Sequence, residues 1–352
     1  MEITDLNEPD YEQVVKCVDP ETGLRAMIAV HDTTLGPSLG GMRMLPYESE
    51  EEALFDVKRL SKGMTYKSAV ADTGLGGGKS VIIGDPKTKT PELFQAMGRF
   101  VDSLGGKYIT AEDMNIGVAD LREVKKTTQY VAGLAVEDGG SGNPSPYTAR
   151  GVVVGMRAVL EEVFGSTDFS GRTVLIQGVG AVGLPMALEL KDKGARVSVC
   201  DIREDYAKQV AETNGFDHVV HAGHHKLDVD IYAPCARGAG VNDETIGELR
   251  CRAIAGCANN ILLEDRHGDE LKERGILYAP DYVINAAGII NVGVEVGPGG
   301  YDEQRAFAKI DKIYDNLKEV FEIARTEGIG THTAADRLAE RRLAAARETQ
   351  GA

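Results

Sequence analysis

Two lysines stand in the chain where an ordinary surface charge is not expected. Lys67 ends the segment Lys62-Gly63-Met64-Thr65-Tyr66-Lys67, and Lys79 follows Gly76-Gly77-Gly78. Ser80-Val81-Ile82-Ile83 comes next, and this run predicts a buried strand. Burial disfavours an ammonium charge and lowers the pKa of a lysine toward the range in which it can accept a proton. The glycines leave room for a small substrate to approach the backbone, so the pattern predicts a reaction centre.

The same residues also resemble part of a phosphate-binding P-loop, Gly-x-x-x-x-Gly-Lys-Ser. Gly78-Lys79-Ser80 fits its end, but Thr73 occupies the position of the leading glycine. The lysine of a P-loop opens a helix, whereas the residues from Val81 to Pro86 are typical of a strand that ends in a turn. The sequence therefore argues against a nucleoside triphosphatase.

A second candidate site lies in the other half of the chain. The apolar run 172–177 is followed at once by Gly178-Val179-Gly180-Ala181-Val182-Gly183, and then by an expected helix over 184–193. A Gly-x-Gly-x-x-Gly sequence between a strand and a helix predicts a dinucleotide site. Its first glycine permits the tight turn, the second the approach of a pyrophosphate, and the third close packing of helix on strand.

An acidic residue follows the next expected strand, 196–200, as the dinucleotide fingerprint requires. This residue, Asp201, is expected to accept hydrogen bonds from ribose hydroxyls and to repel a 2′-phosphate. The prediction is therefore NAD rather than NADP, although the nearby Arg203 weakens that preference. The alternative is a glycine-rich turn that binds nothing.

Elements able to position these residues can be read from periodicity and turn signals. The expected elements of the first part are a hairpin (14–18 and 24–30), a helix from Ser49 to Lys62 with a Ser49/Glu52 capping box and a stop at Gly63, a helix over 91–104 and a strand over 108–111. A loop rich in glycine, serine and proline over 139–146 suits a hinge or domain boundary. The expected elements after it are a helix over 148–164, strands at 231–233, 253–255 and 283–285, and helices over 302–327 and 333–348. Alternating strands and helices predict a parallel, doubly wound sheet.

Composition excludes several classes of function. The chain has 352 residues, which suits two domains, and 42% hydrophobic residues, which is ordinary for globular proteins. Its net charge of −16 argues against nucleic acid or an anionic membrane as partner. No apolar run is long enough to span a membrane, and the acidic N-terminus is unlike a signal peptide. The five cysteines show no paired spacing, so we expect reduced thiols and a cytoplasmic protein.

Four histidines lie close together at His218, His221, His224 and His225 and raise the possibility of a metal. Their segment has the composition of a turn, and the cysteines lack metal-ligand spacing. We therefore expect no metal site.

Segments along almost the whole chain resemble one family, the amino-acid dehydrogenases that act on leucine, valine and phenylalanine and are related to glutamate dehydrogenase. The resembling segments are 39–44, 62–67, 76–86, 109–113, 141–146, 178–183, 230–236, 255–260 and 279–292. Leucine-type members are nearest, partly through the loop Ser141-Gly142-Asn143-Pro144-Ser145-Pro146. The resemblance implies a two-domain α/β fold: an N-terminal α/β substrate and assembly domain (1–140), to which the C-terminal helix (330–352) returns, and a Rossmann-type doubly wound NAD-binding domain (141–329), with an active-site cleft between them.

The resemblance also implies a reaction, the NAD-dependent reversible conversion of an L-amino acid to a 2-oxo acid and ammonia. Lys79 would be the general acid and base, Asp113 would exchange protons with the amino group, and Lys67 would bind the substrate carboxylate with the backbone of Gly40 and Gly41. Thr148 would meet the nicotinamide carboxamide. Asn259, Asn260 and Asn285 would orient the nicotinamide ribose and the substrate.

The substrate side chain would meet an uncharged pocket, which the resemblance assigns to Leu39, Ala111, Ile289 and Val292. A glutamate side chain would be left unpaired there, so leucine, isoleucine or valine is favoured. Phenylalanine stays open as a substrate, because pocket volume cannot be read from sequence. The segment Met114-Asn115-Ile116-Gly117 departs from the leucine-type pattern and puts substrate preference, more than reaction class, in doubt.

Two other functions fit the sequence less well. A hydroxy-acid dehydrogenase would need a histidine proton donor beside an arginine, and the sequence offers no persuasive histidine. A non-catalytic NAD-binding regulator would be expected to lack Lys67, Lys79 or Asp113, and all three are present. The resemblance further implies an assembly of identical subunits.

Overall fold

The computed structural model describes residues 1–351, with side chains as far as Gln350. It divides into two compact units. Unit 1 comprises residues 1–143, 292–302 and the segment from Ala339 onward, and unit 2 comprises 144–291 and 303–338. Each unit contains one six-stranded sheet. None of the helices described is long and apolar enough to cross a membrane.

The sheet of unit 1 is mixed. Its strands are, in spatial order, β1 (Glu2–Asp5), β2 (Gln13–Asp19), β3 (Leu24–Asp32), β5 (Gly76–Ile83), β4 (Ser38–Leu45) and β6 (Tyr108–Ala111). The first three strands and β5 pair antiparallel, whereas β4 pairs parallel with β5 and with β6. The predicted hairpin is confirmed as β2 and β3, and the predicted strand after Lys79 is confirmed as part of β5.

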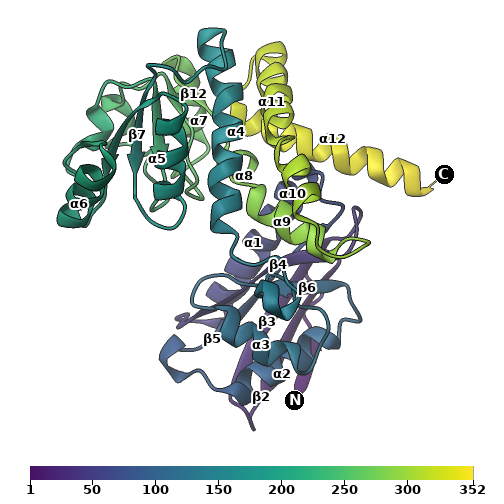
Figure 1. Cartoon of the computed structure of the whole chain (residues 1–352). Coiled ribbons are helices and arrows are strands. Elements are labelled where there is room, and N and C mark those ends of the chain that lie inside the picture. The colour runs from purple at the N-terminus through teal and green to yellow at the C-terminus, as the bar shows by residue number, and fades with distance from the viewer. Residues whose placement is uncertain (352) are drawn as a thin grey trace. The chain divides into compact units, whose positions relative to one another are not determined.

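Helices cover both faces of this sheet (Figure 1). One face carries Met27, Ala29 and Val81, which pack with Ala53 and Val57 of α1 (Glu50–Ala71). The other face packs against α2 (Pro91–Asp102) and α3 (Val118–Lys125). Side chains alternate between the two faces of a strand, so the odd-numbered residues of β5, including Lys79, belong to the face covered by α1.

The predicted end of the first helix at Gly63 is wrong. Helix α1 continues through Gly63 to Ala71, and Asp72 follows with φ of 50°. A helix interior tolerates one glycine at a cost of about 1 kcal/mol, and burial of Thr65, Ser68 and Ala69 offsets it. At the other end, Ser49 accepts the Glu52 N–H at 3.1 Å, as predicted, but the Glu52 carboxylate accepts from Glu48 N–H and not from Ser49.

Unit 2 contains a parallel sheet of Rossmann order. Its strands are, in spatial order, β12 (Leu277–Tyr278), β11 (Ala253–Ile254), β10 (Ile231–Pro234), β7 (Thr173–Gln177), β8 (Arg196–Cys200) and β9 (Asp217–His218). Every pair in this order is parallel. The prediction of a doubly wound parallel sheet is confirmed.

Helices of unit 2 include α5 (Gly183–Asp192) and α6 (Glu204–Asn214), which pack against β8. Helices α4 (Ser145–Phe164) and α11 (Ile313–Glu327) run side by side in Figure 1. The remaining helices of the chain are α7 (Arg266–Glu273), α8 (Asp281–Ile284), α9 (Ala287–Val296), α10 (Glu303–Ile310) and α12 (Thr331–Gly351).

Two predictions in this part are wrong. The expected strand 283–285 is the end of helix α8, because Asp281 and Pro280 start a helical turn in which Asn285 N–H donates to the Asp281 carbonyl. The expected single helix 302–327 is interrupted at Asp311 and Lys312, giving α10 and α11. An apolar triplet such as Val283-Ile284-Asn285 does not by itself distinguish a buried strand from a buried helical turn.

Candidate functional site

Lys79 lies inside a strand, on the face of the sheet covered by α1. It pairs with Ala29 of β3, and only 6% of its surface is exposed. Thr65 of α1 packs directly over Gly77 of β5: a Cβ at Gly77 would lie 2.1 Å from the Thr65 amide nitrogen. The glycines before Lys79 therefore allow the helix to approach the strand closely.

The Lys79 ammonium is paired within a small charged network. Lys79 Nζ forms an ion pair with Asp113 Oδ2, and Arg43 Nη2 lies 3.5 Å from the same oxygen. Arg43 Nη1 also donates to Asp56 Oδ2 of α1 at 3.0 Å. Met114 N–H donates to Asp113 Oδ1 at 2.6 Å, so the loop after β6 fixes the carboxylate. The structure thus brings Lys79 and Asp113 together, as a proton-transfer pair requires.

Burial and charge set the protonation of this pair. Burial lowers the pKa of Lys79 below the usual 10.5 of a lysine, although the charge of Asp113 opposes the shift. Burial alone would raise the pKa of Asp113, but the charges of Lys79 and Arg43 outweigh it and lower that pKa. At neutral pH Asp113 is therefore ionised, and Lys79 can release its proton more readily than a surface lysine can.

Lys67 lies near the C-terminal end of α1 and is half-buried. Its neighbours on both sides contact the glycine end of β5: Thr65 packs on Gly77, and Ser68 Oγ donates to the Gly76 carbonyl at 3.4 Å. Lys67 is thus carried by the part of α1 that packs against the glycine end of β5. Helix α1 is longer than predicted, and the residues past Gly63 form this part.

Gly40 and Gly41 lie on β4, beside Lys79. The pairing of β4 with β5 joins Leu39 to Gly77 and resumes with Met42 and Ser80, on either side of the two glycines. A Cβ at Gly40 would lie 1.8 Å from the Gly78 carbonyl oxygen, and one at Gly41 would lie 2.7 Å from Asp113 Cβ. Only glycine fits at either position, which keeps backbone close to the Lys79–Asp113 pair.

Three of the four predicted pocket residues belong to unit 1 and are buried. Leu39 lies on β4, Ala111 ends β6 and Val292 lies on α9. A Cβ at Gly133 would lie 3.9 Å from Ala111 Cβ and 4.0 Å from Val292 Cγ2, so both side chains lie close to Gly133. The fourth, Ile289, is also buried but belongs to unit 2. A cavity of about 430 Å³ adjoins this region, lined by Glu112, Val118, Gly133, Ala135, Val136, Glu137, Gly142 and Asn143.

The glycine fingerprint of unit 2 has the geometry of a dinucleotide turn. Gly178 has φ of +101°, a backbone conformation that residues other than glycine rarely adopt. A Cβ at Gly183 would lie 2.0 Å from the Gly178 carbonyl oxygen, whereas one at Gly180 meets nothing within 4 Å. Gly178 and Gly183 are thus required by the fold. Gly180 leaves open space next to the N-terminus of α5, where backbone N–H groups favour an anion. Ala181 is exposed and Val182 half-buried at that N-terminus.

Asp201 lies at the end of β8 and joins the glycine turn to its own loop. Its Oδ2 accepts the Val179 N–H at 3.1 Å, and Arg203 donates to both carboxylate oxygens at 3.1 and 3.3 Å. Burial would raise the pKa of Asp201, but the bonds from Arg203 and Val179 outweigh it and lower that pKa. The carboxylate is therefore ionised beside the turn, and a carboxylate has capacity for further donors. Arg203 is 60% exposed at its side chain and stacks over Tyr206.

The structure brings two of the three predicted asparagines together. Asn285 Nδ2 donates to Asn259 Oδ1 at 2.8 Å and to the Cys257 carbonyl at 3.1 Å. Asn260 is exposed, has φ of 52°, and its carbonyl accepts the Ala239 N–H at 2.6 Å. Asn259 and Asn260 follow the carboxyl end of β11, and Asn285 comes after β12 and α8. The carboxyl ends of the strands form the edge at which open α/β sheets bind ligands.

Thr148 lies in the first turn of α4 and is half-buried. It is not the N-cap of the helix, because Pro144 holds that position and Thr148 Oγ1 donates to the Pro144 carbonyl at 3.1 Å. A Cβ at Gly288 would lie 3.3 Å from Thr148 Oγ1, so the hydroxyl faces the start of α9.

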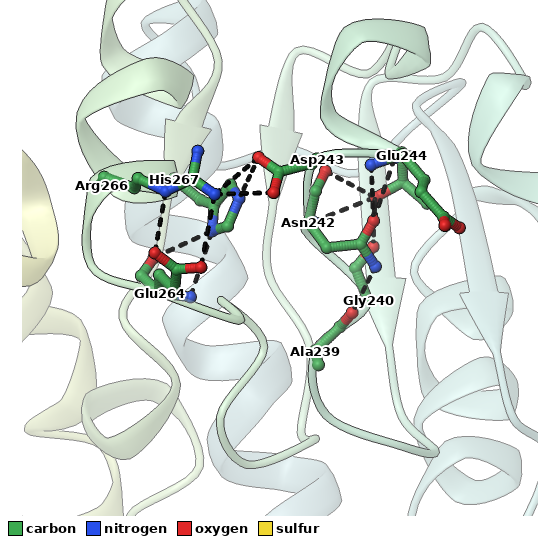
Figure 2. Close-up of polar contacts among 9 residues, drawn as sticks. Ala239, Gly240, Asn242, Asp243, Glu244, Glu264, Arg266 and His267 are labelled. Atoms are coloured by element: carbon green, nitrogen blue, oxygen red, sulfur yellow. Dashed lines mark hydrogen bonds and ion pairs between the residues drawn. The ribbon is translucent and has the colours of Figure 1, made fainter.

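A polar network that the sequence did not reveal holds the loops after β10 and β11 (Figure 2). Asp243 accepts from Arg266 Nη2 at 2.7 Å and lies 3.2 Å from Nε2 of the fully buried His267. In the same loop, Asn242 accepts the N–H groups of Glu244 and Thr245 at 2.9 and 3.1 Å. These bonds fix the loop that contacts Asn260. No sequence signal identified them, since Asp243 and His267 are 24 residues apart in the chain.

The side chains of the histidine cluster have partners other than a metal. His224 Nε2 lies 2.9 Å from the Tyr232 hydroxyl, and His225 Nε2 lies 2.9 Å from Glu248. Within the described part of the chain, no group of three or more histidine, cysteine, aspartate and glutamate side chains could hold a metal ion.

Arg43 is the functional candidate that sequence reasoning missed in unit 1. It lies in the segment Leu39–Met44, to which no charge role was assigned. A charged residue in an otherwise buried strand must be paired, and this was the signal that could have pointed to it. Arg43 pairs with Asp113 and connects it to α1 through Asp56.

Known proteins are similar to this chain over both of its units. A family model described as "Glu/Leu/Phe/Val dehydrogenase, dimerisation domain" matches residues 11–130. A second, "Glutamate/Leucine/Phenylalanine/Valine dehydrogenase", matches residues 139–218 and 198–351. The chain is 50% identical over 352 residues to a leucine dehydrogenase of Thermoactinomyces intermedius, covering 99% of this chain and 96% of that protein. It is 48% identical to a phenylalanine dehydrogenase of Bacillus thermotolerans over 342 residues, covering 96% of this chain and 89% of that protein.

A solved structure is similar over nearly the whole length. The crystal structure of L-tryptophan dehydrogenase from Nostoc punctiforme superposes with a TM-score of 0.87 at 44% sequence identity. The similarity covers 96% of this chain and 97% of that one. Fold and sequence therefore point to the same group of proteins.

Proposed function

This chain belongs to the glutamate/leucine/phenylalanine/valine dehydrogenase family, and we propose that its substrate is a branched-chain L-amino acid. It is an NAD-dependent amino-acid dehydrogenase. Overall, the amino acid, NAD and water give the 2-oxo acid, ammonium, NADH and a proton. The observation that carries the proposed roles is the buried Lys79–Asp113 pair, in a strand lined with glycines.

Lys79 would act as the general base and acid. Its lowered pKa lets the amine take a proton from a water molecule that attacks the substrate imine, forming a carbinolamine. The same group would return the proton when the carbinolamine collapses to the 2-oxo acid and ammonia. Asp113, held ionised by Lys79 and Arg43, would exchange protons with the substrate amino group.

Lys67 would bind the substrate carboxylate. Its half-buried position on the helix that packs against the glycine end of β5 supports this role, because a cation and close backbone donors suit a carboxylate. Gly40 and Gly41 would add backbone groups, since neither leaves space for a side chain.

The residues of unit 2 fit NAD. Open space at Gly180 suits a pyrophosphate at the N-terminus of α5, and the ionised Asp201 suits ribose hydroxyls. When bound, NAD accepts the hydride from the substrate Cα. Asn259 and Asn285 would orient the nicotinamide ribose, and Thr148 would meet the carboxamide. Asn260 would help to orient the substrate. The predicted cleft between domains stays a prediction.

The side-chain pocket favours an apolar substrate. Leu39, Ala111 and Val292 are buried and uncharged, and Ile289 is likewise buried. A second carboxylate in such surroundings would lose its hydration without a partner, which disfavours glutamate. The nearness of both Ala111 and Val292 to Gly133 supports a compact pocket suited to a branched side chain.

Phenylalanine is the second candidate substrate, because phenylalanine dehydrogenases are nearly as similar to this chain as leucine dehydrogenases are. We also propose a homo-oligomer, because the family model that matches residues 11–130 is described as a dimerisation domain. A cytoplasmic location remains a prediction from the reduced cysteines.

The test is NADH formation followed by absorbance. The protein would be mixed with NAD and a panel of L-amino acids that includes leucine, isoleucine, valine, phenylalanine and glutamate, with Lys79→Ala in parallel. We expect NADH with the branched-chain amino acids, less with phenylalanine, none with glutamate, and none from the variant. Activity confined to phenylalanine would overturn the branched-chain proposal. The proposed mechanism would be overturned if no amino acid gave NADH and if, in the reverse reaction, ammonia and 2-oxo acids consumed none.

A further inference from the structure

Two thiols meet at the ligand-binding edge of the unit 2 sheet. Cys235 follows β10, and Cys257 follows the neighbouring strand β11. These strands pair Ile231 with Ala253 and Tyr232 with Ile254, and the same register continued sets Cys235 opposite Cys257. Their side chains are close enough for each to shift the pKa of the other. Both residues are half-buried, whereas the other three cysteines are buried.

The backbones at this point are close enough for a covalent link. Ala258 N–H donates to the Pro234 carbonyl at 3.0 Å, and a Cβ at Gly256 would lie 2.1 Å from the same oxygen. Neighbouring strands lie about 4.8 Å apart. Disulfides join Cα atoms about 4.4–6.8 Å apart, so two cysteines in register on adjacent parallel strands fall within reach.

The backbones of both cysteines contact groups that are assigned to the cofactor site. Cys235 N–H donates to the Gln177 carbonyl at 2.7 Å, and the Cys235–Ala236 peptide packs against Gly178 of the fingerprint. The Cys257 carbonyl accepts from Asn285 Nδ2, which also holds Asn259. A change in the backbone at either cysteine would therefore be transmitted to the glycine turn or to the asparagine pair.

We propose that Cys235 and Cys257 form an oxidisable dithiol site, which a peroxide converts to a disulfide that weakens NAD binding. This inference uses the proposed cofactor site for its readout, but the chemistry of the thiols does not depend on dehydrogenase activity. In the first step the Cys257 thiol releases its proton, the thiolate attacks a peroxide oxygen and the O–O bond breaks. The departing hydroxide takes up a proton, so the products are a sulfenic acid and water. In the second step the Cys235 sulfur attacks the sulfenic sulfur and a second water leaves. The two sulfurs together lose two electrons, and the peroxide gains them.

The two thiols are matched to these two roles. The side chain of Cys235 lowers the pKa of Cys257, which favours a thiolate there. Burial, together with the nearby Cys257, raises the pKa of Cys235 well above its usual range. A reactive cysteine beside a resolving cysteine is the arrangement that forms a disulfide rather than higher oxides.

The experiment uses the reduced, full-length protein treated with hydrogen peroxide, alkylated with N-ethylmaleimide and digested for mass spectrometry. We expect a Cys235–Cys257 cross-linked peptide and a fall from five free thiols to three in a denaturing thiol titration. NADH binding would be followed by NADH fluorescence, which is convenient because the chain has no tryptophan. We expect the Kd for NADH to rise at least tenfold and to recover with dithiothreitol, and bound NADH to slow the oxidation.

Variants separate this site from general oxidative damage. Cys257→Ser and Cys235→Ser should each abolish the cross-link and the change in Kd relative to the untreated variant, whereas Cys251→Ser, at a buried cysteine of the same unit, should behave like the parent. A disulfide elsewhere, or two cysteines oxidised separately, would overturn the proposal. So would a cross-link that leaves the NADH affinity unchanged. These results are independent of the amino-acid panel, because mass spectrometry and NADH binding require no turnover.

Discussion

The two units of this chain prepare their proposed sites by opposite means. Unit 1 buries charges within a sheet: Lys79, Asp113 and Arg43 are held together where water is scarce. Unit 2 presents backbone at the edge of a sheet, where Gly180 has open space and the α5 N-terminus offers N–H groups. Proton transfer depends on shifted pKa values, whereas pyrophosphate binding depends on close approach to the backbone. Substitutions in unit 1 should therefore act by changing charges and pKa values, whereas substitutions in unit 2 should act by changing the space next to the backbone.

The largest effect is expected from Lys79→Ala. Loss of the general base should lower kcat for oxidative deamination by about 10³-fold or more, within the upper range for such groups. NADH binding should change less than about threefold, because Lys79 belongs to unit 1 and the fingerprint to unit 2. Steady-state kinetics and NADH titration measure the two effects separately. A variant that lost NADH binding as severely as turnover would break the comparison between the units.

A large but different effect is expected in unit 2 from two glycine substitutions. Gly180→Ala has space in the protein, so its melting temperature should be unchanged while the Kd for NADH rises about 10- to 100-fold. Gly183→Ala would place a Cβ 2.0 Å from the Gly178 carbonyl and should lower the melting temperature as well. Thermal unfolding and NADH titration of both variants make the test. Equal destabilisation by the two would contradict a ligand-related role for Gly180.

A moderate effect is expected from the network in Figure 2. Asp243→Asn removes the charge that Arg266 and His267 share, and should lower the free energy of unfolding slightly. The Kd for NADH should rise by a few-fold, because the loop that contacts Asn260 is less well held. Glu273→Gln, at an exposed residue of α7 outside the network, is the matched control. An unchanged Kd in Asp243→Asn would show that the loop is positioned without this network.

The smallest expected effect is a shift in the pH profile of Arg43→Gln. The charge of Arg43 lowers the pKa of Lys79, so its removal should raise that pKa. Oxidation requires neutral Lys79, and the rate is therefore gained as pH rises through this pKa. The acidic limb of kcat/KM should move to higher pH in the variant, with the plateau at high pH reduced less than the rate at neutral pH. An acidic limb that moves to lower pH would contradict the assigned direction of the charge effect.

Much of the architecture could be predicted from local pattern. The hairpin of β2 and β3, the β7–α5–β8 unit and the parallel sheet follow from alternation, turn residues and the glycine fingerprint. The predictions failed where the same residues are compatible with more than one local structure. Gly63 resembled a helix stop, yet packing of Thr65 and Ser68 on β5 extends α1 past it. Val283-Ile284-Asn285 resembled a strand, and the turn started by Pro280 and Asp281 decides for a helix.

The sequence by itself determined the family and its cofactor, because glycines at fixed spacing, two unusual lysines and an acidic residue after a strand are chemical requirements carried in local order. Only the tertiary structure decided which charges are paired. Arg43, Lys79 and Asp113 lie on β4, on β5 and after β6, and their ion pairs exist because parallel strands place distant residues side by side. Cys235 and Cys257 meet for the same reason, through strand register that no spacing of cysteines in the sequence reveals.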